Sequence, residues 1–460
     1  MANQQSTATA NSSSISVDQR VMLALTLLAT MVFCHFASFS LFIPLLFFFF
    51  GLHLFYVRKT SWQSFLHLTL LLVLLMGVAH FLKNYSVFSL YYTPIACVAM
   101  ITTLLYNDVQ LSFALSFMAS SLVGLMVGFS FPEVLIFFVG SLCGAYTVQG
   151  ARTREVFFRS AILVGFVQLV CSLLLNTDLS AVHIKTVLIP LLLNGMWCSV
   201  IVAFSLKIFE IVFGEITNFS LIELSDSSQP LIKRLVVEAP GTYHHSLIVS
   251  NLAEAASDAI GANALLTRVG AYYHDIGKLD KPEYFTENQM IAGNKHDDLE
   301  PSMSRLVILN HIKEGLELAK QYKLNRRIVE FIPEHHGTSL IHYFYQKALT
   351  EGEAEEIGEQ DYRYPGPKPK SKETAIVMLA DSVEGATRAM EEHTPQKIED
   401  VVRKVINNKF IDGQLDACNL TLREIDAIAS SFVRVLSAMY HSRVKYPKKT
   451  DGYHGQKSSK

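Results

Sequence analysis

A histidine and an aspartate, His274 and Asp275, stand side by side at the end of a predicted helix. An imidazole next to a carboxylate can give one metal ion a nitrogen and an oxygen, and the second carboxylate oxygen is free for another ion. Gly277 follows, and glycine can adopt positive φ and turn the chain sharply. Because His-Asp neighbours are common on protein surfaces, this pair becomes a site candidate only if the chain supplies further ligands.

Further candidate ligands lie on or beside predicted helices, against apolar faces: His245, His311, His335, His336 and Asp381. His245, for example, shares a helical face with Ile248 and Leu252. A buried histidine or carboxylate is costly without a polar partner. Any one of these residues alone fits a core residue with a hydrogen-bond partner, but the whole series requires a common explanation.

This series of histidines and aspartates favours a centre of two divalent metal ions in which Asp275 is the bridge. Nitrogen and oxygen donors without thiolate suit Fe, Mn or Zn rather than Mg or Ca, and of these we expect Fe or Mn. Two ions about 3.5–4 Å apart are the usual arrangement for hydrolysing phosphate esters. The residues therefore predict a metal-dependent hydrolase of phosphate esters.

The order of these residues resembles that of the HD-domain metal-dependent phosphohydrolases, with Asp381 as the closing aspartate. Longer stretches resemble the seven-transmembrane HD family, which includes the PgpH-type cyclic di-AMP phosphodiesterases. The stretches are Leu224-Ser-Asp, Glu238-Ala-Pro-Gly-Thr-Tyr-His-His-Ser246, Arg268-Val-Gly-Ala-Tyr-Tyr-His-Asp-Ile-Gly-Lys278, Tyr284-Phe-Thr-Glu-Asn-Gln289, Glu334-His-His-Gly-Thr338, Tyr364-Pro-Gly-Pro-Lys368 and Leu379-Ala-Asp-Ser382. The resemblance covers about residues 215–447. The apolar half before them resembles the family in the arrangement of its segments.

The resemblance implies an all-helical hydrolase domain that converts cyclic di-AMP to the linear dinucleotide pApA. It places one metal ion at His245, His274 and Asp381 and the other at His311, His335 and His336. The related class that cleaves cyclic di-GMP has Gly-Tyr-Pro after its histidine pair, whereas this chain has Gly337-Thr-Ser. Two alternatives stay open: another nucleotide phosphohydrolase, including one for cyclic di-GMP, and a membrane receptor that binds nucleotide without turnover.

Several polar residues are candidates for supporting roles. Lys278, one turn past Asp275, is expected to neutralise the scissile phosphate or, after the metal ions lower its pKa, to protonate the leaving oxygen; a solvated lysine at a helix end is the alternative. We expect Thr338 and Tyr343 to contact substrate, and a loop with Lys368 and Lys370 to lie at the surface. Partners that fix the imidazole tautomers are expected at His244, His296 and Asp298.

The N-terminal half of the chain, which precedes the candidate ligands, is strongly apolar. The chain has 460 residues, of which 50% are hydrophobic and 17% charged, and the charges are sparse between Val21 and Phe213. Helices of about 20 apolar residues cross a bilayer. We expect eight crossings, or seven if Ser130-Phe-Pro132 is a kink, in the segments 21–37, 40–57, 64–82, 87–105, 111–129, 132–147, 156–176 and 184–213.

The predicted organisation is all-α: a membrane bundle of seven or eight helices at 21–213, a helical connector at 214–240 and an HD phosphohydrolase domain at 241–447. Polar tails at 1–20 and 448–460 complete it, the first of them disordered. In the connector, Ser227 or Ser228 is expected to cap a helix that starts at Pro230. Arg20, Arg58, Lys59, Arg152 and Arg154 fall on one side of the bilayer, which predicts a cytoplasmic HD domain in a bacterial inner membrane.

Family members usually carry a large extracellular domain after a first membrane helix, and we expect it to be absent here because the loop after the first segment is only about 34–40. The formal net charge is −2 and no Lys/Arg-rich run occurs, which argues against a nucleic-acid polymer as partner. No CxxC pair occurs among the six cysteines, which argues against a zinc ribbon or a thioredoxin motif. The expected partners are a cyclic dinucleotide and the lipid bilayer; an oligomer is compatible with the sequence.

Overall fold

The computed structural model describes residues 61–175, 178–289, 295–351 and 358–440, with scattered positions between 21 and 54. It divides into two units, Met1–Glu223 and Leu224–Lys460. Within the described ranges both units are helical, and the only extended pairing there is one isolated bridge between Leu340 and Arg363. The expectation of an all-α fold is confirmed. The predicted tails and the apolar segments 21–37 and 40–57 lie outside the continuously described residues.

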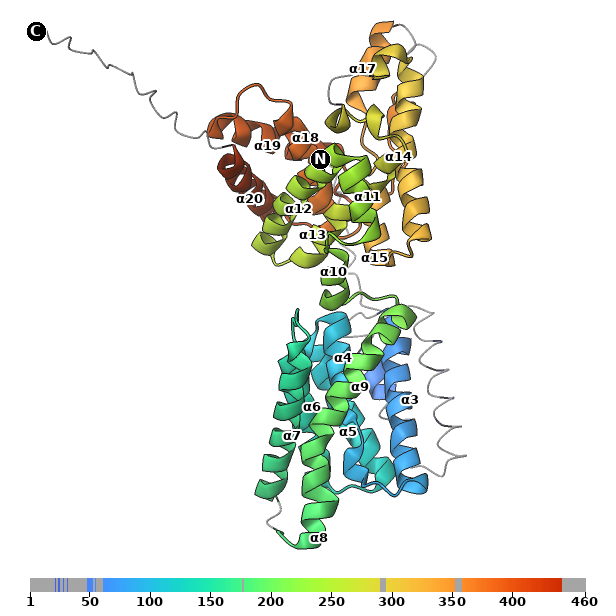
Figure 1. Ribbon diagram of the computed structural model, residues 1–460, viewed down its shortest axis with the longest axis vertical. Coiled ribbons are helices and arrows are strands. Elements are labelled where there is room, and N and C mark those ends of the chain that lie inside the picture. Colours follow the sequence, from blue (N-terminus) through green and yellow to red (C-terminus); the bar gives the residue numbers. More distant parts are fainter. Residues whose placement is uncertain are drawn as a thin grey trace, which may run out of the picture. The chain divides into compact units, whose positions relative to one another are not determined.

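The first unit is a bundle of long apolar helices that run alongside one another (Figure 1). Many of their large side chains are exposed, which suits a lipid environment. Five of the described helices are long and apolar enough to cross a membrane, the last being the continuous run Ala181–Phe213. The bounds are α3 Trp62–Tyr85, α4 Ile95–Tyr106, α5 Val109–Val127, α6 Phe131–Val148, α7 Glu155–Leu175, α8 Ala181–His183, the π-helical turn η2 Ile184–Leu188, and α9 Ile189–Phe213.

The predicted crossing at 87–105 differs from the structure. Its first part is a 3₁₀ turn, η1 (Leu90–Tyr92), and α4 has 12 residues, about 18 Å at 1.5 Å per residue. Pro94 stands before α4 and lacks a backbone N–H, so the regular helical hydrogen-bond pattern is interrupted at this turn. The Asn194 amide donates to the carbonyls of Tyr91 and Thr93, at 3.1 and 3.0 Å, which satisfies them inside the bundle.

The boundary at residues 128–131 is a turn between two helices. Gly128 ends α5 with φ of 82°, a conformation that glycine adopts without steric cost. Phe131 then begins α6, and Pro132 lies in its first turn, where a missing N–H costs nothing. Separate crossings at 111–129 and 132–147 therefore describe this region better than one kinked helix.

The second unit holds the histidine series. α12 lies between α13, α18 and α20, and their buried apolar side chains form the core. The bounds are α10 Asn218–Leu224, which spans the division, α11 Pro230–Glu238, α12 Pro240–Ile260, α13 Ala264–Tyr273, the 3₁₀ helices η3 Ile276–Leu279, η4 Pro282–Tyr284, η5 Thr286–Asn288, η6 Lys295–Asp298 and η8 Glu359–Tyr362, α14 Pro301–Gln321, α15 Arg326–Val329, α16 Phe331–Glu334, α17 His342–Glu351, α18 Lys372–Arg388, α19 Pro395–Ile411 and α20 Leu422–Met439.

The connector contains two short helices, α10 and α11. The predicted cap of α11 is wrong: Gln229 occupies the cap position because Pro230 is the first helical residue, and the Ser228 backbone N–H donates to Asp226. α11 packs on α12 and η3 and so belongs to the second unit. α12 begins at Pro240, directly after α11, which puts His245 in its second turn.

Candidate metal centre

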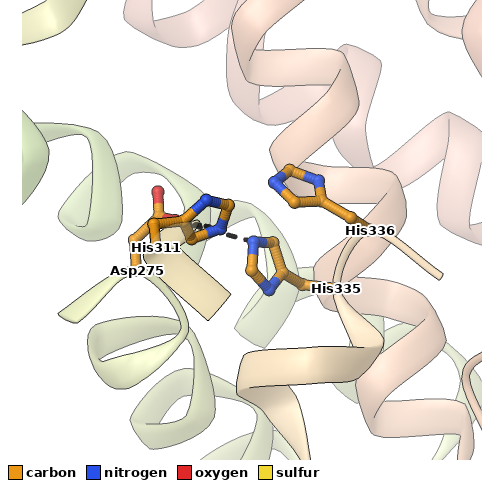
Figure 2. A group of neighbouring side chains, drawn as sticks. All are labelled: Asp275, His311, His335 and His336. Atoms are coloured by element: carbon orange, nitrogen blue, oxygen red, sulfur yellow. Dashed lines mark ion pairs between the residues drawn. The ribbon is translucent and has the colours of Figure 1, made fainter. Parts of the chain in front are cut away.

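The donor atoms of the predicted ligands form two groups: Asp275, His311, His335 and His336, and His245, His274 and Asp381. Within each group the donor atoms all lie within 4.8 Å of one another. Figure 2 shows the first group, with His311 and His335 directed toward Asp275. All seven candidates are brought together from segments that are far apart in the sequence.

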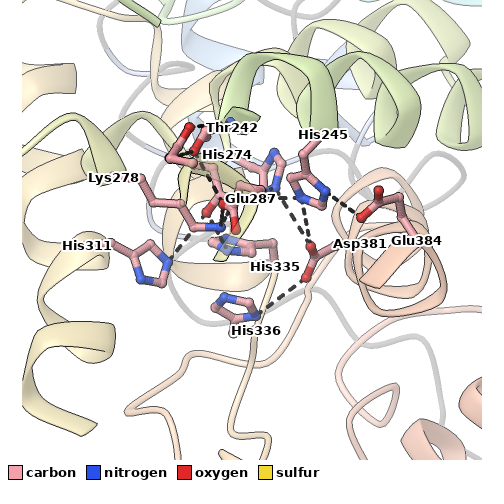
Figure 3. Close-up of polar contacts among 12 residues, drawn as sticks. Thr242, His245, His274, Lys278, Glu287, His311, His335, His336, Asp381 and Glu384 are labelled. Carbon is pink, nitrogen blue, oxygen red and sulfur yellow. Dashed lines mark hydrogen bonds and ion pairs between the residues drawn. The ribbon is translucent and has the colours of Figure 1, made fainter. Parts of the chain in front are cut away.

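Asp275 lies between the two groups because its carboxylate oxygens point to different histidines. Oδ1 is 3.7 Å from His311 Nε2 and 3.5 Å from His335 Nε2. Oδ2 is 3.2 Å from His274 Nε2 and 3.7 Å from His245 Nε2. Figure 3 shows these histidines together with His311, His335, His336 and Asp381. One oxygen for each group is the arrangement that a bridging carboxylate requires.

Helix ends and helix faces set these positions. His274 caps the C-terminal end of α13 and Asp275 precedes η3, so a sharp change of direction brings both side chains inward. His335 caps the C-terminal end of α16, and Glu334, the last residue of that helix, accepts from the Lys370 N–H at 3.0 Å and the Thr374 hydroxyl at 2.8 Å. The histidine pair is thereby fixed to α18, the helix that carries Asp381.

Each buried imidazole is oriented by a bond on the nitrogen that faces away from the centre. Nδ1–H of His274, His311 and His335 donates to the carbonyl of Ala271, Ile308 or Ile332, at 2.7, 2.5 and 2.7 Å. A carbonyl accepts only, so Nδ1 carries the proton and Nε2 presents its lone pair to the centre.

Several inward atoms have no hydrogen-bond partner within the described part of the chain: the Nε2 atoms of His274, His311 and His335 and Oδ1 of Asp275. Oδ2 of Asp275 faces the Lys278 ammonium, and Nε2 of His245 lies 3.1 Å from Asp381 Oδ1. A buried polar atom without a partner is costly, and a set that converges on one volume is what bound cations satisfy. The donor set and its orientation therefore fit metal ions.

Burial and neighbouring charges shift the pKa values of the aspartate and histidines in the centre. Burial raises the pKa of Asp275, but Lys278 and His274 outweigh it and hold that pKa well below its usual range. Burial and the neighbouring positive charges lower the pKa of His311 to about 4. Burial also lowers the pKa of His245, but Asp381 and Glu384 reverse this and raise it to about 9.

Lys278 lies next to Asp275, the proposed bridge. Its Nζ lies 2.6 Å from Asp275 Oδ2 and 2.8 Å from Glu287 Oε1. Burial lowers its pKa, but these two carboxylates outweigh that effect and the pKa is raised. The side chain is therefore a buried cation held beside Asp275, and the alternative of a solvated surface lysine does not fit its burial.

The expected positive φ at Gly277 is wrong, because this residue lies in the 3₁₀ helix η3 without it. Glycine is required there for space. A Cβ atom would lie 1.7 Å from the His311 carbonyl oxygen and 2.5 Å from the Gly315 nitrogen. η3 and α14 can approach closely only at this glycine, and the approach brings His311 to Asp275.

The partners predicted to orient the imidazoles differ from those found. His244 and Asp298 are exposed, and Nε2 of the buried His296 bonds with the Tyr284 carbonyl at 2.8 Å. Glu384 has that role for His245, with Oε2 2.7 Å from Nδ1. A signal was present: Glu384 stands three residues after Asp381 on α18, and residues at that spacing share a helix face.

Replacing Glu384 with glutamine is expected to weaken metal binding at the group of His245, His274 and Asp381. The amide can still accept from His245 but no longer supplies charge, and such changes cost about 10–100-fold in metal affinity. Competition with a fluorescent chelator measures the affinity. Glu254→Gln, on the surface of α12 opposite Arg268, is the control; equal losses in both variants would contradict this role.

Two family models match consecutive parts of the chain: the 7TM receptor with intracellular HD hydrolase at residues 33–217 and the HD domain at residues 242–386. The chain belongs to the 7TM-HD family. The resemblance inferred from the motifs is confirmed, and with five described helices apolar enough to span this family member is a membrane protein.

The chain is similar in sequence to two proteins named cyclic-di-AMP phosphodiesterase and to a solved HD domain. It is 40% identical to the cyclic-di-AMP phosphodiesterase PgpH of Bacillus subtilis (strain 168), over 83% of this chain and 55% of the relative. It is 38% identical to the protein of that name from Listeria monocytogenes serotype 1/2a (strain 10403S), over 78% and 50%. The chain thus spans about half the length of these relatives. The crystal structure of the L. monocytogenes PgpH HD domain covers 46% of this chain and 100% of its own, with 47% identity and a TM-score of 0.44.

Proposed function

We propose that this chain is a membrane-anchored phosphodiesterase that hydrolyses cyclic di-AMP to pApA with two divalent metal ions. One observation carries the proposal: the inward donor atoms converge in two groups, and Asp275 offers one oxygen to each. The two relatives named cyclic-di-AMP phosphodiesterase support the choice of substrate.

The proposed ligands follow the two groups. His245, His274 and Asp381 would hold one ion, and His311, His335 and His336 the other, with Asp275 shared. Two such ions, when bound, acidify a water molecule, clamp the phosphate oxygens and neutralise the leaving oxygen. A set rich in imidazole and free of thiolate favours Fe or Mn.

The role proposed for Lys278 is electrostatic. Its ammonium is held by Asp275 and Glu287 in a buried setting, so the charge is fixed before substrate arrives and needs no reorganisation during the reaction. Lys278 would stabilise negative charge on the phosphate. Glu287 in turn holds Lys278 and accepts from the Thr242 hydroxyl at 3.3 Å.

Thr338 and Tyr343 remain proposed substrate contacts. Thr338 follows His336 by two residues, and its N–H donates to Gln414 Oε1 at 2.8 Å, which fixes the loop beside the histidine pair. Tyr343 exposes 64% of its surface and is free to stack on a base. By contrast, the Lys368 ammonium pairs with Asp416, and 71% of that carboxylate side chain is exposed, as expected of a surface loop.

Product analysis tests the proposed substrate. The purified full-length protein with Mn²⁺ or Fe²⁺ is incubated with cyclic di-AMP or cyclic di-GMP, and the products are separated by chromatography. We expect pApA, with kcat/KM at least about a hundredfold above that for cyclic di-GMP, because hydrogen-bonded base recognition discriminates strongly. Equal turnover of both would contradict the substrate, and tight cyclic di-AMP binding without linear product would favour a receptor.

The proposed orientation places the HD domain in the cytoplasm of a bacterial cell and the protein in its inner membrane. The excess of Lys and Arg in the loops on one side supports it. Protease added to spheroplasts should leave tags at both ends of the chain intact, because eight crossings place both termini inside. Cleavage of the N-terminal tag alone would indicate an odd number of crossings.

A further inference from the structure

An apolar groove of about 920 Å³ lies along α7 and α9 in the first unit. These helices cross closely because small residues meet: a Cβ on Gly165 would lie 2.1 Å from the Leu192 carbonyl oxygen, and one on Gly195 would lie 2.3 Å from that of Ala161. Figure 1 shows the two helices side by side. Small residues along the crossing leave the space between larger side chains open.

The walls of the groove are large apolar side chains directed outward. Phe158 on α7 is 71% exposed and Phe204 on α9 is 82% exposed, and both line the groove. Along α9 the apolar part of the lining runs from Leu192 to Leu206, about 21 Å at 1.5 Å per residue. One leaflet is about half of a 30 Å hydrocarbon layer, so the groove is long enough for an acyl chain in one leaflet.

Charged and polar groups gather at one end of the groove, where α7 begins and α9 ends. Arg154 pairs with Glu223 of α10 at 2.9 Å, and Lys207 pairs with Glu210 at 3.1 Å. The Lys207 ammonium also donates to the Ser220 hydroxyl at 2.8 Å. All of these residues line the groove, so its polar end offers two cations and two carboxylates with no excess of either charge.

We propose that this groove binds a phospholipid whose headgroup carries a phosphate and a primary ammonium. The phosphate accepts hydrogen bonds from Arg154 and Lys207, and the ammonium donates to Glu223. An anionic headgroup without an amine would engage the two cations and supply no positive charge to the two carboxylates, and a quaternary ammonium has no N–H to donate. Charge complementarity therefore selects a zwitterionic aminophospholipid, with an acyl chain along the apolar walls.

A lipid in this groove would also contact α10, whose residues Phe219, Ser220 and Glu223 line it. Phe219 of α10 stacks on Phe157 of α7 at a ring distance of 5.5 Å. Glu210 accepts from the Thr217 N–H at 2.9 Å and from the Ser220 hydroxyl at 2.6 Å. A headgroup between Arg154 and Lys207 therefore adds to the contacts that hold α10 against α7 and α9.

Native mass spectrometry tests the site on the full-length protein in detergent with equimolar phosphatidylethanolamine, phosphatidylglycerol and phosphatidylcholine. We expect one retained phosphatidylethanolamine per chain, favoured roughly tenfold over the other two, because charge-assisted hydrogen bonds supply the difference. Ala203→Trp, which fills the groove at an exposed position, should abolish retention, and Arg154→Gln with Glu223→Gln should abolish the preference.

Arg159→Gln is the matched control, since Arg159 forms an exposed ion pair with Glu155 on α7 at 2.8 Å and does not line the groove. It should retain lipid as the unmodified chain does. Equal retention of the three lipids, a preference for phosphatidylglycerol, or unchanged retention in Ala203→Trp would overturn the proposal. A change from dimer to monomer in Ala203→Trp without loss of lipid would also overturn it, because the groove would then be an interface between copies.

Discussion

Replacing Asp275 with alanine is expected to remove both metal ions and to lower turnover of cyclic di-AMP by at least about a thousandfold. The carboxylate is 1% exposed and faces histidines of both groups, so no other side chain can take its place. Two ions supply several kcal/mol of transition-state stabilisation, and each 1.36 kcal/mol corresponds to a factor of ten in rate.

The same substitution also affects folding, since it removes one of the two carboxylates that neutralise the buried Lys278. Breaking a buried ion pair typically costs about 3–5 kcal/mol. Asp275→Asn keeps the shape and separates the two effects: we expect it to fold and still lose metal and turnover. Asp416→Ala, which removes the exposed partner of Lys368, should behave as the unmodified protein. Retention of two ions by folded Asp275→Asn would rule out the bridge.

Gly277→Ala is expected to lower the free energy of unfolding of the HD unit by about 3 kcal/mol, at the upper end of the cost of overpacking. The new methyl group would meet the His311 carbonyl oxygen at 1.7 Å and the Gly315 nitrogen at 2.5 Å. Both are backbone atoms of α14, so the helix must move and His311 moves with it. The group of Asp275, His311, His335 and His336 should then lose its ion.

Thermal unfolding and metal analysis of the same preparation measure both effects. Gly385→Ala on α18 is the control, because its Cβ would meet no atom within 4 Å and alanine is favoured over glycine by about 0.5–1 kcal/mol inside a helix. We expect that variant to be as stable as the parent or more so. If Gly277→Ala kept its stability and its metal, η3 and α14 would not need this close approach.

The predicted ligands could be found from sequence because their chemistry and spacing are local. His274 and Asp275 are adjacent, and His245 and Asp381 stand on amphipathic helices whose buried face periodicity reveals. Resemblance to a family added the order of the series. The pairing of Asp275 Oδ1 with His311 and of Oδ2 with His274 depends on tertiary packing, which no spacing specifies.

Other features depend on contacts between distant segments and were missed or misassigned. The close approach at Gly277 involves His311 and Gly315 of α14, more than 30 residues later in the chain, and the raised pKa of Lys278 depends on Asp275 and Glu287 together. α4 begins only after Pro94, and the amide of Asn194, about 100 residues away, donates to two carbonyls of the preceding turn. Apolar composition alone predicted a longer helix there.

Metal stoichiometry with X-ray absorption tests the central claim, a pair of metal ions that share Asp275, most directly. The full-length protein is loaded with Fe²⁺ or Mn²⁺, freed of excess metal and analysed for bound ions per chain. We expect about two ions and a metal–metal scattering distance of about 3.5–4 Å. One ion per chain, or two ions without that scattering distance, would contradict the account.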